Sequence, residues 1–241
     1  AVAVEVNAET DFVAKNEKFR NYVADVAAQA LNTTAADIDA FLAEPWAQDT
    51  TKTVKEALAA QIAVIGENMN IRRFKQVEEQ NGFVASYIHA EGKIGVLVDV
   101  ETDVVNDEIK EMAKNIAMQI TAMKPVYTND SEVDEEYKAH ELEIIKSQIE
   151  NDPKMAGKPE KVINGAIMGR LNKQLKEICL LDQVYVKAED GKQSVAAYVA
   201  QVAKANGANV TVKGFVRFET GEGMEKKNED FAAEVAAQLG K

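Results

Sequence analysis

The sequence predicts an α+β protein made of two similar subdomains, each an antiparallel sheet of about three strands packed with helices, plus an inserted antiparallel helical hairpin. Three observations predict this class. A strand-like motif recurs along the chain, an amphipathic helical stretch follows each copy, and a long pair of mostly polar helices interrupts the pattern. The chain has 241 residues, 46% of them hydrophobic, which is enough to bury a core in each subdomain.

The recurring motif alternates apolar and polar residues and ends in Glu-Thr. Its first copy lies at 4–11 (VEVNAETD), its second at 98–103 (VDVETD) and a weaker third at 216–220 (VRFET); the first copy carries two extra residues, Asn7 and Ala8. Alternation predicts a strand, and apolar residues three and four positions apart predict a helix packed on a sheet. These apolar residues are Phe19, Val23, Val26, Ala27 and Ala30, then Ile109, Met112, Ala113, Ile116 and Ile120, then Phe231, Val235 and Leu239.

Other segments complete the predicted core. Apolar spacing predicts a helix over 54–65 that ends at the Gly-Glu-Asn turn, 66–68. We expect a strand over 71–78 and a hairpin of strands 83–90 and 94–101, with the three strands forming one antiparallel sheet. Further along, we expect a strand over 181–187, a helix over 194–206 and a last hairpin that bends near Lys213.

The inserted arm is predicted over 131–180. The segment 131–134 is typical of a helix start, and the polar stretch to Glu150 is followed by breaks at Pro153 and Pro159. A second helix over about 160–180 carries one apolar stripe, so the two helices are expected to form a protruding antiparallel hairpin. The stripe consists of Val162, Ile163, Ala166, Ile167, Leu171, Leu175 and Ile178.

Charge and composition exclude several classes of protein. The net charge is −12, and acidic neighbours dilute the small basic cluster of Arg72, Arg73 and Lys75, so direct nucleic-acid binding is not expected. No apolar run has membrane-spanning length and no signal peptide is evident, while Cys179 is the lone cysteine; we therefore expect a protein of the cytoplasm. The chain opens directly as a strand without an initiator Met, which we interpret as a missing N-terminal portion.

The sequence does not predict a catalytic centre. Its two histidines, His89 and His140, have no partners at metal-ligand spacing, and Cys179 beside an apolar stripe is interpreted as a core residue. The Thr-Gly-Glu-Gly run at 220–223 lacks the glycine pattern of a phosphate-binding loop. We expect no metal, no cofactor and no enzyme activity, although an enzyme using paired carboxylates remains a competing reading.

The residues Thr10, Asp11, Phe12 and Val13, called the corner below, stand out against the repeat. The second copy has Val104 where the first has Phe12, and the third has Gly221 where the first has Asp11, so the fold itself does not require this pair. Two interpretations are open. Thr10 or Asp11 caps the coming helix while Phe12 packs inward, or Phe12 is exposed beside a carboxylate and inserts into a partner's pocket.

Five motifs in order resemble bacterial translation elongation factor Ts over the whole chain. They are TDFVAK at 10–15, IGENxNIRR at 65–73, SYxH at 86–89, GKP at 157–159 and GFxRFExGEG at 214–223. The resemblance implies a guanine-nucleotide exchange factor for elongation factor Tu that here lacks its N-terminal helical domain. It further implies a core N-terminal subdomain at 1–82 with its first strand missing, a second subdomain at 83–130 and 181–225, a coiled-coil or dimerisation hairpin at 131–180, and a C-terminal helical module at 226–241.

The resemblance also implies which residues contact the partner. Thr10, Asp11, Phe12 and Val13 correspond to a wedge that displaces magnesium from the partner's nucleotide site. Further contacts are implied for Ile65, His89 and Val186, although Val184 stands where the family often has Pro. The implied assembly is a homodimer or a Tu–Ts heterotetramer. The alternative function is an acidic adaptor or assembly protein without exchange activity.

Overall fold

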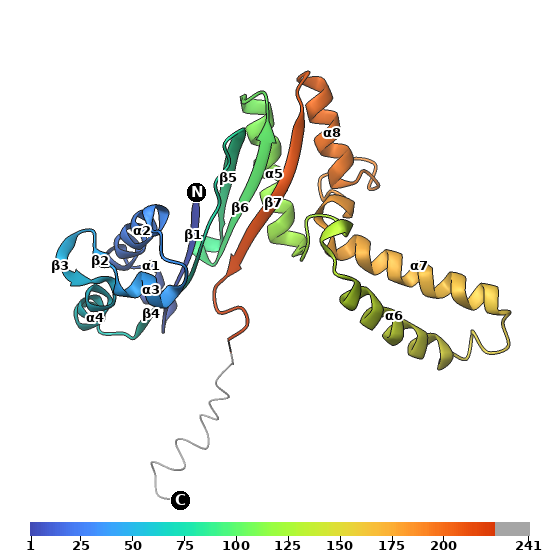
Figure 1. The fold of residues 1–241 in the computed structure, drawn as a ribbon, viewed down its shortest axis with the longest axis horizontal. Helices are drawn as coiled ribbons and strands as arrows, with labels where there is room; N and C mark the ends of the chain where they lie inside the picture. The colour runs from blue at the N-terminus through green and yellow to red at the C-terminus, as the bar shows by residue number, and fades with distance from the viewer. Residues whose placement is uncertain (225–241) are drawn as a thin grey trace, which may run out of the picture.

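The computed structural model describes residues 1–224, and these form two sheet-and-helix repeats with a helical arm projecting from the second (Figure 1). The helix expected over 226–241, with Phe231, Val235 and Leu239, lies outside the described residues. The elements are β1 Val2–Ala8, α1 Asp11–Lys15, α2 Glu17–Asn32, α3 Ile38–Ala43, β2 Pro45–Trp46, β3 Asp49–Thr53, α4 Val54–Ile65, β4 Met69–Gln76, β5 Gly82–His89, η1 Ala90–Gly92, β6 Ile94–Thr102, α5 Asp107–Met123, η2 Asp130–Glu132, α6 Glu135–Glu150, α7 Glu160–Ile178, η3 Leu180–Asp182, α8 Val195–Ala205 and β7 Val210–Glu219.

The α+β class is confirmed, and strand pairing is antiparallel throughout the named sheets. The first sheet pairs β1 with β4, and a small separate sheet pairs β2 with β3. The second sheet has the order β5-β6-β7. Within the described chain the first sheet therefore has two strands and the second has three.

The first repeat, residues 1–76, buries its core between the first sheet and helices α2 to α4. Phe19, Val26, Phe41 and Val54 form the centre of this core, and Ile71 of β4 closes it from the sheet side. Helix α4 begins at a capping box of Thr53 and Glu56, and it ends at Gly66, whose φ of 84° is readily accessible to glycine. The helix expected over 54–65 is thus confirmed, whereas α3 and the β2–β3 hairpin were not predicted.

The second repeat packs α5 and α8 against the second sheet. Helix α5 buries Ile109, Met112, Ile116 and Ile120, four of the apolar positions that predicted it. The expected hairpin is confirmed as β5 and β6, joined by η1. The third strand of this sheet is β7. The prediction that the strand over 71–78 joins this hairpin in one sheet was wrong, because that strand, β4, pairs with β1.

Two further expectations were wrong in this repeat. The strand β7 runs straight through Lys213, because a bulge rather than a turn absorbs the extra residue there. The segment expected as a strand over 181–187 begins with η3, and Val184 makes only an isolated bridge to Ser194. The buried amide of Gln119 supplies hydrogen bonds to this segment in place of a neighbouring strand.

The arm consists of α6 and α7, which run antiparallel away from the sheets (Figure 1). Its core is small: Ile145 and Ile149 of α6 meet Ile167 and Leu171 of α7. At its base, the N–H groups of Val126 and Tyr127 donate to the Ile178 carbonyl. Among residues 1–224, no helix combines the length and apolarity needed to cross a membrane.

Candidate functional site

The corner joins β1 to α1, and it is fastened to the turn that follows α4. Thr10 is the N-cap of α1 and accepts a hydrogen bond from the Val13 N–H at 3.3 Å. Its hydroxyl donates to Oε1 of Glu67 at 2.6 Å, and its N–H donates to Oε2 of the same carboxylate at 3.0 Å. The structure thus brings together two motifs that lie 57 residues apart in the sequence.

The side chain of Phe12 is 83% exposed. It is therefore neither a core residue nor a staple against the helix, and the inward interpretation of Phe12 is excluded. Asp11 is also exposed, and within the described residues its one ion pair is with Lys15, at 3.8 Å. Val13 is half-buried against the core of the first repeat, so the corner has an anchored side and a free side.

At the corresponding corner of the second repeat, the carboxylate of Asp103 holds two segments of the chain together. Asp103 accepts hydrogen bonds from the backbone N–H and the side chain of Asn209, at 2.8 and 2.7 Å, and these bonds lower its pKa. Thr102 is buried, and its hydroxyl donates to the Val104 carbonyl. Asp103 thus ties the end of β6 to the start of β7, whereas among residues 1–224 the carboxylate of Asp11 makes no such structural bond.

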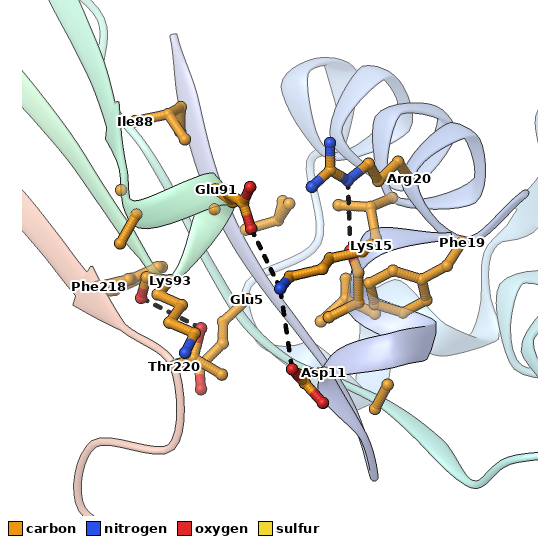
Figure 2. A pocket seen from close by; sticks show the side chains of 18 of the residues that line it. Glu5, Asp11, Lys15, Phe19, Arg20, Ile88, Glu91, Lys93, Phe218 and Thr220 are labelled. Carbon is orange, nitrogen blue, oxygen red and sulfur yellow. Dashed lines mark hydrogen bonds and ion pairs between the residues drawn. The ribbon is translucent and has the colours of Figure 1, made fainter. Parts of the chain in front are cut away.

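A cavity of about 370 Å³ lies between the corner and the turn from β5 to β6 (Figure 2). Its apolar lining includes Val4, Ile88 and Phe218. Lys15 spans one side, with its Nζ 3.8 Å from Asp11 and 3.6 Å from Oε2 of Glu91. Helix α1 is therefore tethered to the first repeat through Thr10 and to the second through Lys15.

The other sequence-predicted contact residues lie in three different places. Ile65 is half-buried at the end of α4, next to the Glu67 turn that holds the corner. His89 is exposed at the end of β5, with its Nδ1 3.1 Å from the Tyr87 hydroxyl. Val186 is half-exposed in the segment after the arm. Within residues 1–224, neither His89 nor Val186 hydrogen-bonds to the corner.

The position of Val186 depends on a residue that sequence reasoning missed. Gln119 of α5 is fully buried; its Oε1 accepts from the Val186 N–H at 2.8 Å, and its Nε2 donates to the Val184 carbonyl at 3.1 Å. The same Nε2 lies 3.1 Å from the side-chain oxygen of Gln183. A polar residue on the apolar face of a predicted helix was the available signal for this role.

The described residues offer little to covalent or metal chemistry. Residues 1–224 contain no group of three or more His, Cys, Asp or Glu side chains that could hold a metal ion. Burial, aided by neighbouring acidic groups, raises the pKa of the Cys179 thiol to about 11, which leaves it protonated near neutral pH. An exposed aromatic ring on an anchored corner is instead suited to binding a protein surface.

Comparison with known proteins identifies the family. Residues 9–222 match the family model described as Elongation factor TS, a range that contains the whole corner and the arm and most of the two repeats. The chain belongs to the elongation factor Ts family. The resemblance inferred from the five motifs is thereby confirmed.

Curated members of the elongation factor Ts family agree along the chain. The Elongation factor Ts of Clostridium tetani is 46% identical over 239 residues, which is 99% of this chain and 77% of that relative. The Elongation factor Ts of Clostridioides difficile is 48% identical, with 99% and 76% covered, and that of Clostridium novyi is 44% identical with the same coverage. Nearly all of the chain thus aligns with each of these relatives.

Proposed function

We propose that this chain binds elongation factor Tu in the cytoplasm and promotes release of GDP during translation elongation. Membership in the elongation factor Ts family supports this function at the level of the whole chain. At the level of the site, the observation that carries the proposal is the exposed ring of Phe12 beside Asp11, on a corner that Thr10 anchors to Glu67.

The proposed mechanism is mechanical and electrostatic. A GTPase holds its nucleotide through phosphate contacts and a magnesium ion, which demands near-octahedral coordination and tolerates little distortion. Insertion of Phe12 and Asp11 would displace the segments that support this ion, and so weaken nucleotide binding. The coupling is reciprocal: if the factor loosens GDP, GDP loosens the factor by the same free energy. The exchange step makes and breaks no covalent bond, so the factor needs no general acid or base.

Additional contacts would keep elongation factor Tu bound while the corner is inserted into its nucleotide site. In this proposal Ile65 extends the corner surface, and His89 and Val186 form a second contact region on the other repeat. Two linked contact regions raise the effective concentration of each for its target. The division into core subdomains at 1–82 and at 83–130 with 181–225 fits this use. The arm at 131–180 is proposed as the dimerisation element of a homodimer or Tu–Ts heterotetramer.

The test compares Phe12→Ala with Val105→Ala. Val105 is a matched control because it is 50% exposed on the equivalent corner of the second repeat. We expect the parent chain and Val105→Ala to accelerate loss of labelled GDP from elongation factor Tu equally. Phe12→Ala should lower the acceleration by on the order of 10–100-fold, as truncation of an interface hot spot does.

Two outcomes would contradict the proposal. Equal exchange by a folded Phe12→Ala variant would remove the wedge role from this ring. Binding of elongation factor Tu by the parent chain without any change in GDP release would instead indicate the adaptor function.

A further inference from the structure

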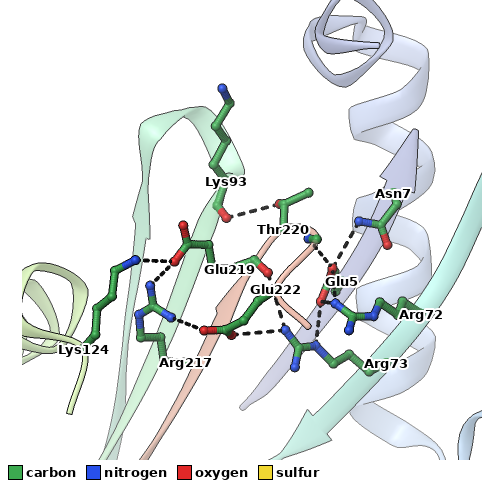
Figure 3. A network of polar contacts seen from close by, with 11 residues as sticks. Glu5, Asn7, Arg72, Arg73, Lys93, Lys124, Arg217, Glu219, Thr220 and Glu222 are labelled. Atoms are coloured by element: carbon green, nitrogen blue, oxygen red, sulfur yellow. Dashed lines mark hydrogen bonds and ion pairs between the residues drawn. The ribbon is translucent and has the colours of Figure 1, made fainter. Parts of the chain in front are cut away.

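The carboxylate of Glu5 links the two repeats from a buried position. Glu5 lies at the middle of β1 and is 4% exposed. Oε1 accepts from Nη1 of Arg72 at 3.0 Å and from the Gly221 N–H at 2.9 Å, and Oε2 accepts from Nε of Arg73 at 2.6 Å (Figure 3). Asn7 donates a further bond to Oε1 at 3.1 Å. Glu5 thus joins donors of the first sheet to a donor beyond the end of β7.

A bulge explains how two consecutive arginines reach one carboxylate. Successive side chains of a regular strand point to opposite faces, so Arg72 and Arg73 would ordinarily diverge. Glu5 is opposite Arg73 and Val6 is opposite Ile71, which leaves Arg72 as an additional residue in β4. A bulge of this kind redirects side chains locally, and here both guanidinium groups meet Glu5.

Arg73 makes a second set of contacts across the same junction. Its guanidinium carbon lies 4.2 Å from the centre of the Phe218 ring in β7. Its Nη2 lies 3.5 Å from the Glu219 carbonyl and 3.6 Å from Oε2 of Glu222. Figure 3 shows that this network continues through Glu219 to Lys124, at the end of α5. The junction is therefore charged. The contacts that cross it, from Gly221 to Glu5 and from Arg73 to Phe218, Glu219 and Glu222, depend on how the repeats are oriented.

Buried charges of this kind favour one arrangement over alternatives. A rotation of the first sheet that separates Gly221 from Glu5 would break the hydrogen bond from the Gly221 N–H to the buried carboxylate. Loss of a hydrogen bond to a buried charge costs free energy of folding. Gly221 has a φ of 78°, a conformation that glycine adopts without strain, and in this conformation its N–H points to Glu5. Packing of apolar side chains alone would tolerate small rotations much better, because it is not directional.

We propose that Glu5 is a positioning residue, which fixes the orientation of the first repeat against the second and thereby sets the corner relative to His89 and Val186. The functional part of this inference rests on the exchange function proposed above. The corner begins at Thr10, five residues after Glu5 and two after the end of β1, whereas His89 and Val186 belong to the second repeat. A fixed orientation lets both contact regions meet one partner at the same time.

The orientation can be measured directly with spin labels on Lys55→Cys in α4 and Lys114→Cys in α5. Both lysines are exposed, and Cys179 is buried, so the labels go to the introduced positions. We expect one narrow distance distribution in the parent and a broader one in Glu5→Gln. The matched control is Asp99→Asn, which removes the carboxylate at the equivalent position of the second repeat and should keep the narrow distribution.

Exchange kinetics give a second readout that loss of stability alone would not produce. Glu5→Gln should raise the concentration of factor needed for half-maximal GDP release by about tenfold. With the repeats no longer held in one orientation, the contact region of His89 and Val186 has a lower effective concentration at the partner once the corner is bound. The rate at saturating factor should stay near that of the parent, since the corner is intact. Phe12→Ala should lower that saturating rate instead.

Several outcomes would overturn the proposal. A distance distribution in Glu5→Gln as narrow as in the parent would do so, as would an unchanged half-maximal concentration. If Glu5→Gln does not fold, the same distance measurement is made on Arg73→Lys. This variant keeps the positive charge but loses the Nε donor to Glu5 and the planar stack on Phe218. A distance distribution in Arg73→Lys as narrow as in the parent overturns the proposal. A parent chain without effect on GDP release would overturn the exchange function, while the label distances still decide the orienting role of Glu5.

Discussion

Glu5 and Asp99 occupy equivalent positions in the two repeats, each directly before the register shift of its sheet. In the first sheet the additional residue is Arg72, and in the second it is Lys213. The electrostatic surroundings differ. Two arginines and a backbone N–H surround Glu5, whereas Asp99 lies beside the carboxyl of Glu79, and Lys213 reaches Glu79 at 3.0 Å. The repeated geometry therefore holds one stabilised carboxylate and one destabilised carboxylate.

The Asp99 carboxylate is expected to reduce stability at neutral pH. Burial and the neighbouring Glu79 raise the pKa of Asp99 above its ordinary value of 3.8. The folded state then binds more protons than the unfolded state, so stability falls as the pH rises through that raised pKa. Asp99→Asn should raise the Tm at pH 7 by about 2 °C, the shift that roughly 0.5–1 kcal/mol produces at this chain length.

Asp103→Asn is the control of opposite sign for this prediction. Hydrogen bonds from Asn209 lower the pKa of Asp103, so its charged form is the stabilised one and its removal should lower the Tm at pH 7. Thermal melts at pH 7 and pH 3 test both variants. Near pH 3 the advantage of Asp99→Asn should disappear. A Tm that falls in both variants at pH 7 would contradict the assignment for Asp99.

Glu5 should contribute stability that acid removes. Burial opposes its charge, but hydrogen bonds from Gly221, Asn7, Arg72 and Arg73 outweigh that effect and lower the pKa below its ordinary value of 4.5. The unfolded state therefore binds the proton first, and stability is lost as the pH falls below 4.5 and through the folded-state pKa. Denaturant midpoints measured from pH 7 to pH 3 should fall less steeply in Glu5→Gln than in the parent. Parallel curves would show that Glu5 does not carry this dependence.

The sequence predicted elements better than it predicted their partners. Helical periodicity located α2, α4, α5 and α7 because the apolar stripe is a local property, and a helix-start signal located α6. Strand pairing is not local: β6 pairs with β7, and the whole arm lies between them in the chain. An alternating pattern shows which face of a strand is buried but does not identify its neighbour. For this reason β4 was placed in the wrong sheet, and the bulge at Lys213 was taken for a turn.

The same distinction holds for the site. The repeat showed that Phe12 was not required by the fold, but whether its ring points inward depends on where the five residues of α1 pack. The contacts that position the site come from distant segments: Glu67 holds Thr10, and Gln119 holds Val186. Neither pairing has a signature in sequence spacing, because each depends on tertiary packing.

Thr10→Ala should loosen the corner more than it destabilises the protein. It removes the cap that receives the Val13 N–H and the bonds of the hydroxyl to Glu67, and loss of such a cap costs about 1 kcal/mol. Hydrogen exchange at the amides of Val13 and Ala14 should become faster, and GDP release from elongation factor Tu should be accelerated less. Both effects follow because α1 is short and none of its residues is buried.

Thr53→Ala is the matched control for the corner. Thr53 caps α4 through the same type of bond, in a capping box with Glu56, so its removal should cost a similar free energy. This variant should leave the Val13 amide protected and GDP release unchanged. Equal losses of exchange activity in Thr10→Ala and Thr53→Ala would mean that global stability, rather than the corner, limits the reaction.

Gln119→Leu should uncouple the segment 183–186 from α5. The leucine leaves the Val186 N–H and the Val184 carbonyl without their partner, and a buried polar group left unpaired costs about 1–3 kcal/mol. We expect a lower Tm and weaker binding to nucleotide-free elongation factor Tu, measured by calorimetry, because Val186 loses its fixed position. Thr121→Val on the same helix is the control and should spare binding, since the Thr121 hydroxyl donates to the Ala117 carbonyl of its own helix. Unchanged affinity in Gln119→Leu would remove Val186 from the proposed contact region.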